Sequence, residues 1–408
     1  MTTATLPTST NAATNMGNVS ARPMRIAVMG FRGVPNNYSG IEAICENLFA
    51  AFAEMGHKVT VYCRPGVIEK KLDVHRGIRL VRTPAPGGKN GETLSHSLLS
   101  LTHAITRGDV HENGEKFDLI SLHSIAPNLF IKLARLARLP VISHVHGLDH
   151  MREKWKGLGA KVIRQAEREM VKHAAQIVTV NSEIVDYYKT KFGVDAALLP
   201  NGVHAVSDDF TPDAATLSRF GLTPGGFVVC IGRLVPEKRC HDTIEAFKKV
   251  KTDRKLVFVG EGKHTPEYVE QIKKQASDDP RILFTGLQTG EALQTLFRSA
   301  ALYVTASELE GMPSSLLECM ERNVCAITSN IAPHRELMSR VPAYDLGFEV
   351  GDIATLTQRI QTALDHGAHR NTIAGMARAF VREHYAWPVL AKRTEELYRQ
   401  VLERSRGS

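Results

Sequence analysis

The chain has 408 residues, of which 43% are hydrophobic and 23% charged, so it is long enough for two globular domains of ordinary composition. Its formal net charge of +8 at pH 7 would suit a nucleic acid partner. We find no helix-turn-helix pattern, no zinc-finger spacing and no clustered aromatic residues, and therefore exclude nucleic acid binding. No apolar run approaches the roughly 20 residues that span a bilayer.

The first 23 residues are rich in Thr, Ala, Ser and Asn and lack the basic start and apolar core of a signal peptide, so we predict a disordered tail. The six cysteines have neither metal-binding nor redox-motif spacing. Reduced thiols in a cytoplasmic protein are the expected state.

Short apolar strands alternate with helices through the first half of the chain. We predict a strand at 24–30, an amphipathic helix at 41–55 and a strand at 58–63, which together make a β-α-β unit. Further strands are expected at 119–122, 141–144 and 177–180, and turn residues at 198–203 end this half. The alternation predicts a doubly wound parallel sheet.

A histidine, His146, follows the strand at 141–144 and precedes Gly147, which puts it at the carboxyl end of a parallel strand, where ligands bind. We select it as a candidate catalytic residue, and Asp149 is near enough in sequence to orient it. The alternative is a metal site made by His144, His146 and His150, although no cysteine accompanies them.

Charge is divided unevenly between the two halves. Residues 1–204 contain 25 Lys and Arg against 17 Asp and Glu, whereas residues 205–408 contain 26 of each kind. Basic helical stretches are expected at 131–139 and 154–172. This face could dock on an anionic membrane surface or receive an anionic acceptor, or it could be a solvated helix surface.

The second half opens with a buried strand at 227–234, with Gly232 and Arg233 at its end, followed by a loop with Lys238 and a helix at 242–250. Arg233 could hold a phosphate through two parallel hydrogen bonds, and Lys238 would add a point charge.

Two carboxylates, Glu310 and Glu318, lie eight positions apart around the start of a predicted helix. The turn between them, with its open amides, predicts an anion site made by Gly311, Met312, Pro313, Ser314 and Ser315. Pro313 is expected at the first helical position, with the amides of Met312, Ser314 and Ser315 unpaired. Because carboxylates repel phosphate, we expect the two glutamates to accept hydrogen bonds from hydroxyl groups. Together these groups predict a nucleotide-sugar site.

These segments resemble the retaining GT-B glycosyltransferases of family 4, and in particular a bacterial branch that builds exopolysaccharide, capsule or lipopolysaccharide. The matching segments are Gly232-Arg233-Leu234, Glu237-Lys238, Val259-Gly260-Glu261-Gly262, Leu283-Phe284-Thr285-Gly286, the Glu310/Glu318 pair, Gly30-Phe31-Arg32-Gly33-Val34-Pro35, Ser39-Gly40-Ile41-Glu42 and His144-Val145-His146-Gly147.

The resemblance implies an α/β GT-B fold, with two Rossmann-like doubly wound domains facing a central cleft. We expect the tail at 1–23, an acceptor-binding domain at 24–204, a nucleotide-sugar-binding domain at 205–387, and a terminal helix at 388–408 that packs back on the first domain. The implied activity is retaining, metal-independent transfer of a hexose from a nucleotide-diphosphate sugar to a glycan or lipid-diphosphate-linked acceptor, with no cofactor. The location would be cytoplasmic, with peripheral association at the inner face of the plasma membrane left open.

The family's residue roles carry over at matching positions. His146 would contact the donor sugar, and Gly40 would let the backbone approach the donor, although Ser39 replaces a glycine that is usual there. Gly260, Gly286 and Leu287 would line the base site, and Glu318 would accept hydrogen bonds from the ribose. Two alternatives remain: a sugar-nucleotide epimerase on the same fold, and a non-catalytic nucleotide-sugar-binding subunit.

Overall fold

The computed structural model describes residues 22–35, 40–69, 71–110, 114–148 and 158–407. The chain divides into two compact units. The first contains the chain up to Leu199 and the segment from Ala391 onward, and the second is Pro200–Leu390. The boundaries expected from the sequence are at 204 and 387. The first falls earlier because Val203 bonds to the second unit: its N–H donates to the Tyr385 carbonyl (2.8 Å) and its carbonyl accepts from the Trp387 N–H (3.3 Å). The predicted disordered tail lies almost wholly outside the described residues.

The first unit is built on an eight-stranded sheet in the order β3-β4-β2-β1-β5-β6-β7-β8. All neighbouring strands pair in parallel except β3, which runs antiparallel to β4. The strands are β1 (Arg25–Met29), β2 (Lys58–Cys63), β3 (Val74–His75), β4 (Ile78–Arg82), β5 (Leu119–His123), β6 (Val141–Val145), β7 (Gln176–Thr179) and β8 (Ala197–Leu198). Chain order reverses direction between β1 and β5, and ligands of such sheets bind at this switch point, beyond the carboxyl ends of the strands.

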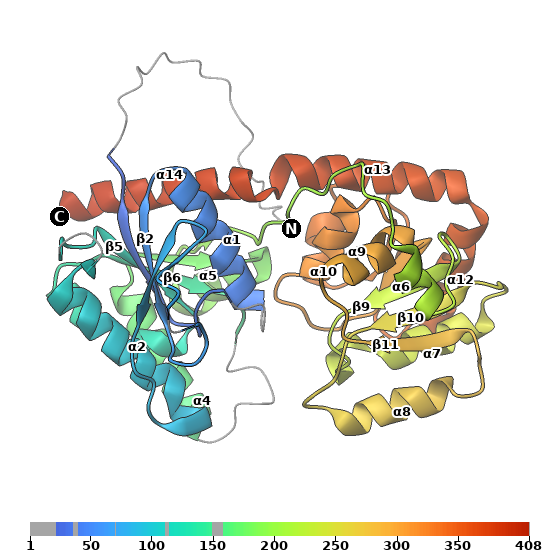
Figure 1. Cartoon of the computed structure of the whole chain (residues 1–408), viewed down its shortest axis with the longest axis horizontal. Helices are drawn as coiled ribbons and strands as arrows, with labels where there is room; N and C mark the ends of the chain where they lie inside the picture. Colours follow the sequence, from blue (N-terminus) through green and yellow to red (C-terminus); the bar gives the residue numbers. More distant parts are fainter. Residues whose placement is uncertain (1–21, 36–39, 70, 111–113, 149–157, 408) are drawn as a thin grey trace, which may run out of the picture. The chain divides into compact units, whose positions relative to one another are not determined.

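Helices cover both faces of this sheet, with α1 and α14 on one face and α2 and α4 on the other (Figure 1). The helices of this unit are α1 (Gly40–Glu54), α2 (Gly88–Arg107), a 3-10 turn η2 (Ala126–Phe130), α3 (Ile131–Leu136), α4 (Leu158–His173), α5 (Ser182–Phe192) and most of α14 (Trp387–Arg406). Helix α5 has local end signals: the Asn181 side chain accepts from the Ile184 N–H, and Gly193 adopts the left-handed conformation just beyond its end.

The second unit is built on a six-stranded, entirely parallel sheet in the order β11-β10-β9-β12-β13-β14. Its strands are β9 (Phe227–Ile231), β10 (Lys255–Val259), β11 (Ile282–Gly286), β12 (Leu302–Thr305), β13 (Ala326–Ser329) and β14 (Gly347–Phe348). Here chain order reverses between β9 and β12, so this sheet also has a switch point near its centre.

The helices of the second unit also lie on both faces, with α7 and α8 on one side and α9 and α10 on the other (Figure 1). The set comprises α6 (Ala214–Arg219), a 3-10 turn η4 (Pro236–Lys238), α7 (Cys240–Lys249), α8 (Pro266–Ala276), α9 (Gly290–Ser299), α10 (Ser314–Glu321), α11 (Ala332–Met338), α12 (Ile353–Asp365) and α13 (Gly367–His384). One hydrophobic core joins the sheet to these helices, and β9 is deeply buried in it, with Phe227, Val228 and Val229 fully covered.

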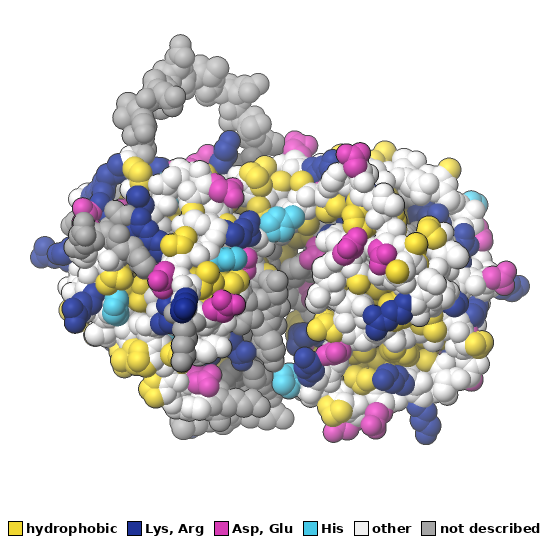
Figure 2. Space-filling model, viewed as in Figure 1, with side chains coloured by type: hydrophobic (Ala, Val, Ile, Leu, Met, Phe, Trp, Pro, Cys, Tyr) yellow, Lys and Arg dark blue, Asp and Glu magenta, His cyan; other side chains and the backbone are white. Residues whose placement is uncertain are grey.

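The predicted α/β class, with two Rossmann-like doubly wound domains, is confirmed. All six cysteines are free thiols, and only Cys230 is not fully buried. None of the helices in the described residues combines the length and hydrophobicity that a membrane span needs. On the face shown in Figure 2, Lys and Arg side chains are interspersed with Asp and Glu over both units.

Candidate functional site

The switch point of the second sheet brings together side chains that are far apart in the sequence. Arg233 and Lys238 follow β9, Glu310 follows β12, and β9 and β12 are paired neighbours. The Lys238 ammonium forms an ion pair with the Glu310 carboxylate, and the two side chains are only 19% and 12% exposed. A predicted phosphate ligand and a predicted sugar ligand therefore lie in contact at one point.

Backbone and side-chain bonds hold these two loops against each other. The Glu308 N–H donates to the Glu237 carbonyl (2.9 Å), next to both members of the ion pair. Arg239 adopts a left-handed conformation (φ 47°) and its guanidinium donates to Glu308 (3.0 Å) and to Asp242 (2.6 Å). These bonds determine where Lys238 emerges relative to Glu310.

Arg233 lies beside this pair in the chain but is exposed. Its guanidinium forms no hydrogen bond or ion pair to any residue in the described part of the chain. It is therefore available to an anion without breaking an existing contact.

The turn before α10 is partly as predicted. The helix begins at Ser314, so Pro313 precedes it and is not its first residue. The Ser314 amide is not open, because its N–H donates to the Met312 carbonyl (2.9 Å). For the N–H groups of Met312 and Ser315, by contrast, the described residues provide no acceptor. The Ser315 hydroxyl bonds to the buried Tyr303 hydroxyl (2.9 Å), which ties the helix start to β12.

Glu318 lies inside α10, as predicted, with its side chain 40% exposed and one carboxylate oxygen 3.6 Å from Arg322. Desolvation raises the pKa of this carboxyl above its ordinary value, while the positive charge of Arg322 opposes the shift. Gly311 and Met312 are half-buried between the two glutamates, and Pro313 is buried.

The predicted base-site residues lie at the ends of β10 and β11. The Gly260 N–H donates to the Gly286 carbonyl (3.0 Å), and Leu287, just beyond, is 54% exposed. Gly260 has a φ of +147°, and a Cβ built there would lie 1.9 Å from the Gly232 carbonyl oxygen. The fold itself therefore requires a glycine at 260, independently of any ligand.

Gly260→Ala should lower the free energy of unfolding by about 1–3 kcal/mol, because the added methyl group clashes with backbone and the φ is strained. Urea unfolding of the whole protein measures this. Gly375→Ala is the matched control, since a Cβ there meets nothing within 4 Å and the site is helical. Equal unfolding midpoints for the two variants would contradict this account of Gly260.

In the first unit, three residues lie at the carboxyl ends of the strands around the switch point. Gly30 follows β1, His123 ends β5, and His146 comes just after β6. The Nε2 atom of His146 lies 3.0 Å from Nδ1 of His123, and their rings are stacked with centroids 5.3 Å apart. Burial lowers the pKa of His146 to about 4. At neutral pH the ring is uncharged, so it can donate at one nitrogen and accept at the other.

Gly40 is the first residue of α1, and a Cβ built there would meet nothing within 4 Å. The packing of the described chain thus does not require glycine at this position. Ser39, Asp149 and His150, which entered the sequence argument, lie outside the described residues. Among the residues that the structure describes, no group of three or more His, Cys, Asp or Glu side chains is arranged to hold a metal ion.

Two buried histidines, His123 and His334, lie near the predicted site residues but were not predicted from the sequence. His123 contacts His146, and its signal was available because it too ends an apolar strand. His334 bonds through Nδ1 to the Ser329 carbonyl (3.0 Å) at the start of α11. Burial lowers its pKa to about 4, and the charges of Glu310 and Lys238 shift it in opposite directions, so the ring lies near that ion pair.

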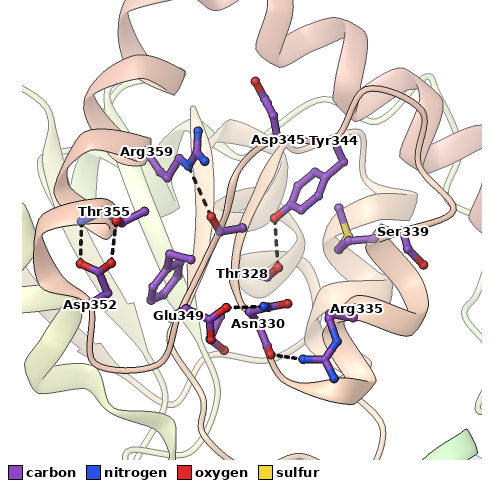
Figure 3. A pocket seen from close by; sticks show the side chains of 14 residues that line it. Thr328, Asn330, Arg335, Ser339, Tyr344, Asp345, Glu349, Asp352, Thr355 and Arg359 are labelled. Atoms are coloured by element: carbon purple, nitrogen blue, oxygen red, sulfur yellow. Dashed lines mark hydrogen bonds between the residues drawn. The ribbon is translucent and has the colours of Figure 1, made fainter. Parts of the chain in front are cut away.

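A separate cavity of about 450 Å³ lies beside β13 and β14 (Figure 3). Its polar walls are largely bonded to one another: Asn330 to Glu349, Arg335 to the Asn330 carbonyl, Tyr344 to Thr328, and Asp352 to Thr355. None of the predicted site residues lines it. The donor-site hypothesis therefore rests on the switch point and not on this cavity.

Two family models match the chain. Residues 38–206 match Glycosyltransferase Family 4, and residues 222–380 match Glycosyl transferases group 1. An uncharacterized glycosyltransferase of Methanocaldococcus jannaschii is 22% identical, over 93% of this chain and 99% of the relative. The UDP-Gal:alpha-D-GlcNAc-diphosphoundecaprenol alpha-1,3-galactosyltransferase of Escherichia coli is 24% identical, over 79% of this chain and 81% of the relative.

Solved structures agree on the fold. Anabaena HepE, solved in complex with UDP and glucose, superposes with a TM-score of 0.74 at 16% identity, covering 92% of this chain and 100% of that chain. The sucrose-phosphate synthase of Thermosynechococcus elongatus gives a TM-score of 0.74 at 18% identity, covering 93% of this chain and 99% of that chain. At such identities the likeness shows the fold alone.

Proposed function

We propose that this chain, a family 4-like glycosyltransferase with the GT-B fold that uses nucleotide sugars, is a retaining hexosyltransferase of bacterial surface polysaccharide synthesis. The acceptor we propose is a glycan or a lipid-diphosphate-linked sugar. The observation that supports this most is the contact of Lys238 with Glu310 at the switch point, next to the start of α10. The Escherichia coli relative, named for a diphosphoundecaprenol-linked acceptor, supports the acceptor class.

The diphosphate leaving group gains negative charge as the glycosidic bond breaks. In our proposal, Arg233, Lys238 and the open amides of Met312 and Ser315 stabilise this charge, so no metal ion is required. Lys238 is paired with Glu310, so the incoming diphosphate would share or replace that contact.

The remaining groups orient the sugar. Glu310 would accept hydrogen bonds from sugar hydroxyls and stabilise positive charge at the anomeric carbon, and His146 would contact a hydroxyl near that carbon. Neither Glu310 nor Glu318 acts as a nucleophile in this proposal. The departing phosphate takes the proton of the acceptor hydroxyl, and attack on the same face retains the anomeric configuration.

A thermal-shift panel of UDP, GDP, dTDP and ADP with their sugars, with and without a chelator, tests the donor site. A nucleotide at a hundred times its Kd should add about 2.7 kcal/mol of stability. Stabilisation by one base, unaffected by the chelator, is the expected result and identifies the sugars to assay. If no nucleotide stabilises the protein, the proposed function is wrong.

Glu318→Ala should raise the donor KM more than Glu318→Gln does, because the amide oxygen can still accept a hydrogen bond from ribose. Initial rates at varied donor concentration measure both variants. Indistinguishable kinetics for the two variants and the parent protein would remove Glu318 from the ribose site.

We also propose that the first unit docks on an anionic membrane surface through α3. This short helix has two exposed leucines, Leu133 and Leu136 (38% and 81% exposed), beside basic side chains. Part of the basic charge is neutralised within the unit, since Lys132 pairs with Glu169 (3.0 Å).

Binding to vesicles that contain anionic lipid should therefore fall as salt rises, because screening weakens the attraction. Leu136→Asp should weaken binding further, since it removes apolar contact and adds repulsion. Cosedimentation measures both effects, with zwitterionic vesicles as the control. Binding that is absent or insensitive to salt would reject electrostatic docking.

A further inference from the structure

A network of hydrogen-bonded polar side chains runs from His146 to the C-terminal helix α14. His146 Nε2 lies 3.0 Å from His123 Nδ1, and His123 Nε2 lies 3.0 Å from the Ser121 hydroxyl. The Ser121 hydroxyl lies 2.8 Å from the Tyr398 hydroxyl, which in turn lies 2.7 Å from Nε2 of His144. Tyr398, Ser121 and His123 are fully buried. This network thus joins β5, β6 and α14 within the first unit.

Sheet geometry explains why these groups meet. Ser121 and His123 are two apart in β5, so their side chains point to the same face. β6 pairs beside β5 in a register that sets His144 next to His123, and the two rings stack with centroids 4.5 Å apart. Tyr398 approaches from α14, and Phe52 of α1 packs on its ring at 5.6 Å.

Each hydroxyl has one proton to donate, so the hydrogen bonds of this network run in one of two directions along its whole length. The phenol of Tyr398 is a more acidic O–H than the Ser121 hydroxyl and is therefore the stronger donor to a neutral imidazole. Tyr398 therefore donates to His144, and Ser121 donates to Tyr398. His123 then donates from Nε2 to Ser121, which leaves a lone pair on its Nδ1, and His146 donates from Nε2 to that lone pair.

A second contact is compatible with this direction. The Cys45 sulfur lies 3.3 Å from the same Nδ1 of His123. Burial, and then the charge of Glu42, raise the pKa of Cys45 well above its ordinary value, so it remains a thiol and a weak S–H donor. The thiol can donate to a lone pair on Nδ1, so this contact is compatible with the direction given above.

We infer that Tyr398 is a positioning residue: through Ser121 and His123 it holds His146 in the Nε2–H tautomer, with a lone pair on Nδ1 that accepts a hydroxyl of the donor sugar. Nδ1 of His146 is buried and has no partner within the described residues, so it is the vacant end of the network. This rests on the role proposed above for His146.

Removing the Tyr398 hydroxyl should reverse the donor–acceptor direction of the hydrogen bonds between Ser121 and His146. Without that acceptor, Ser121 turns its proton toward His123 Nε2. His123 then carries its proton on Nδ1 and donates to His146 Nε2, so His146 becomes an Nδ1–H donor. Ser121→Ala should have the same effect, because His123 Nε2–H then has no acceptor, and it removes a much smaller group.

The experiment measures nitrogen-15 imidazole spectra of the full chain with labelled histidine, with the His146 signals identified by their loss in His146→Asn. The parent protein should show the Nε2–H tautomer at His146. The variants Tyr398→Phe and Ser121→Ala should show the Nδ1–H tautomer. Both should lower kcat/KM for the intact nucleotide sugar about five- to tenfold, as expected for one hydrogen bond. The Kd of the free nucleoside diphosphate should be unchanged.

Tyr62→Phe is the matched control, since Tyr62 is fully buried in the same unit and its hydroxyl bonds to His103 Nδ1 (3.2 Å), which is not part of this hydrogen-bond network. It should leave the His146 tautomer and donor kinetics unaltered. An unchanged tautomer in both test variants, or an equal change in the control, overturns the inference. The tautomer readout needs no turnover, so the assignment can be judged even if the protein transfers no sugar.

Discussion

Arg233→Ala should lower the transfer rate by about 10²–10³, equivalent to roughly 3–4 kcal/mol of transition-state stabilisation, because one donor to the departing diphosphate is lost. It should also weaken binding of the nucleoside diphosphate itself, since in our proposal the guanidinium contacts phosphate before and after the bond breaks. Calorimetry measures the binding and initial rates measure the turnover.

The variant should fold normally, because the Arg233 side chain is exposed and makes no contact that the described structure would lose. Arg340→Ala is the matched control. Arg340 is also exposed in the second unit, just beyond the end of α11, and this substitution removes the same charge from another place. Unchanged diphosphate affinity in Arg233→Ala would remove Arg233 from the phosphate site. An equal loss in both variants would indicate a general effect of charge.

Glu310→Gln should lower kcat by about 10²–10³ while affinity for the free nucleoside diphosphate is kept or raised. The amide keeps the shape of the side chain but removes the negative charge that we propose to face the anomeric carbon. It also releases Lys238 from its ion pair, so the ammonium becomes fully available to phosphate. Rates with saturating donor, together with calorimetry of the nucleotide, separate the two effects.

Glu308→Gln provides the control for this prediction. Glu308 is two residues away, and its carboxylate is 45% exposed and paired with Arg239 (3.0 Å). Its loss should change stability slightly and leave kcat close to that of the parent. If Glu310→Gln retains normal turnover, the carboxylate has no part in stabilising the transition state.

Local patterns in the sequence were sufficient to predict much of this protein. Strand β2 was predicted at its observed bounds, and β9 was recognised by its continuous apolar run that ends at Gly232. The spacing of Glu310 and Glu318 placed one carboxylate before α10 and one within it, as observed. These features depend on the period of hydrophobic residues and on turn residues, which act over a few positions of the chain.

Backbone detail at a helix end was less predictable. The Ser314 amide was expected to be open, but the turn folds back so that it donates to the Met312 carbonyl. Whether an amide at a helix start is open depends on the dihedral angles of the two preceding residues, and residue type restricts these only weakly for Met312. The sequence therefore indicated an anion site at α10 without showing which N–H groups remain available.

Only the tertiary structure decided which residues meet. Lys238 pairs with Glu310 because β9 and β12 are neighbours, and Tyr398 reaches His144 from a helix at the far end of the chain. Strand order depends on which faces bury one another across long stretches of chain, and nothing local to His146 indicates a partner in α14. The sequence by itself determined the elements and the chemical types of the candidate groups, whereas long-range packing determined their partners.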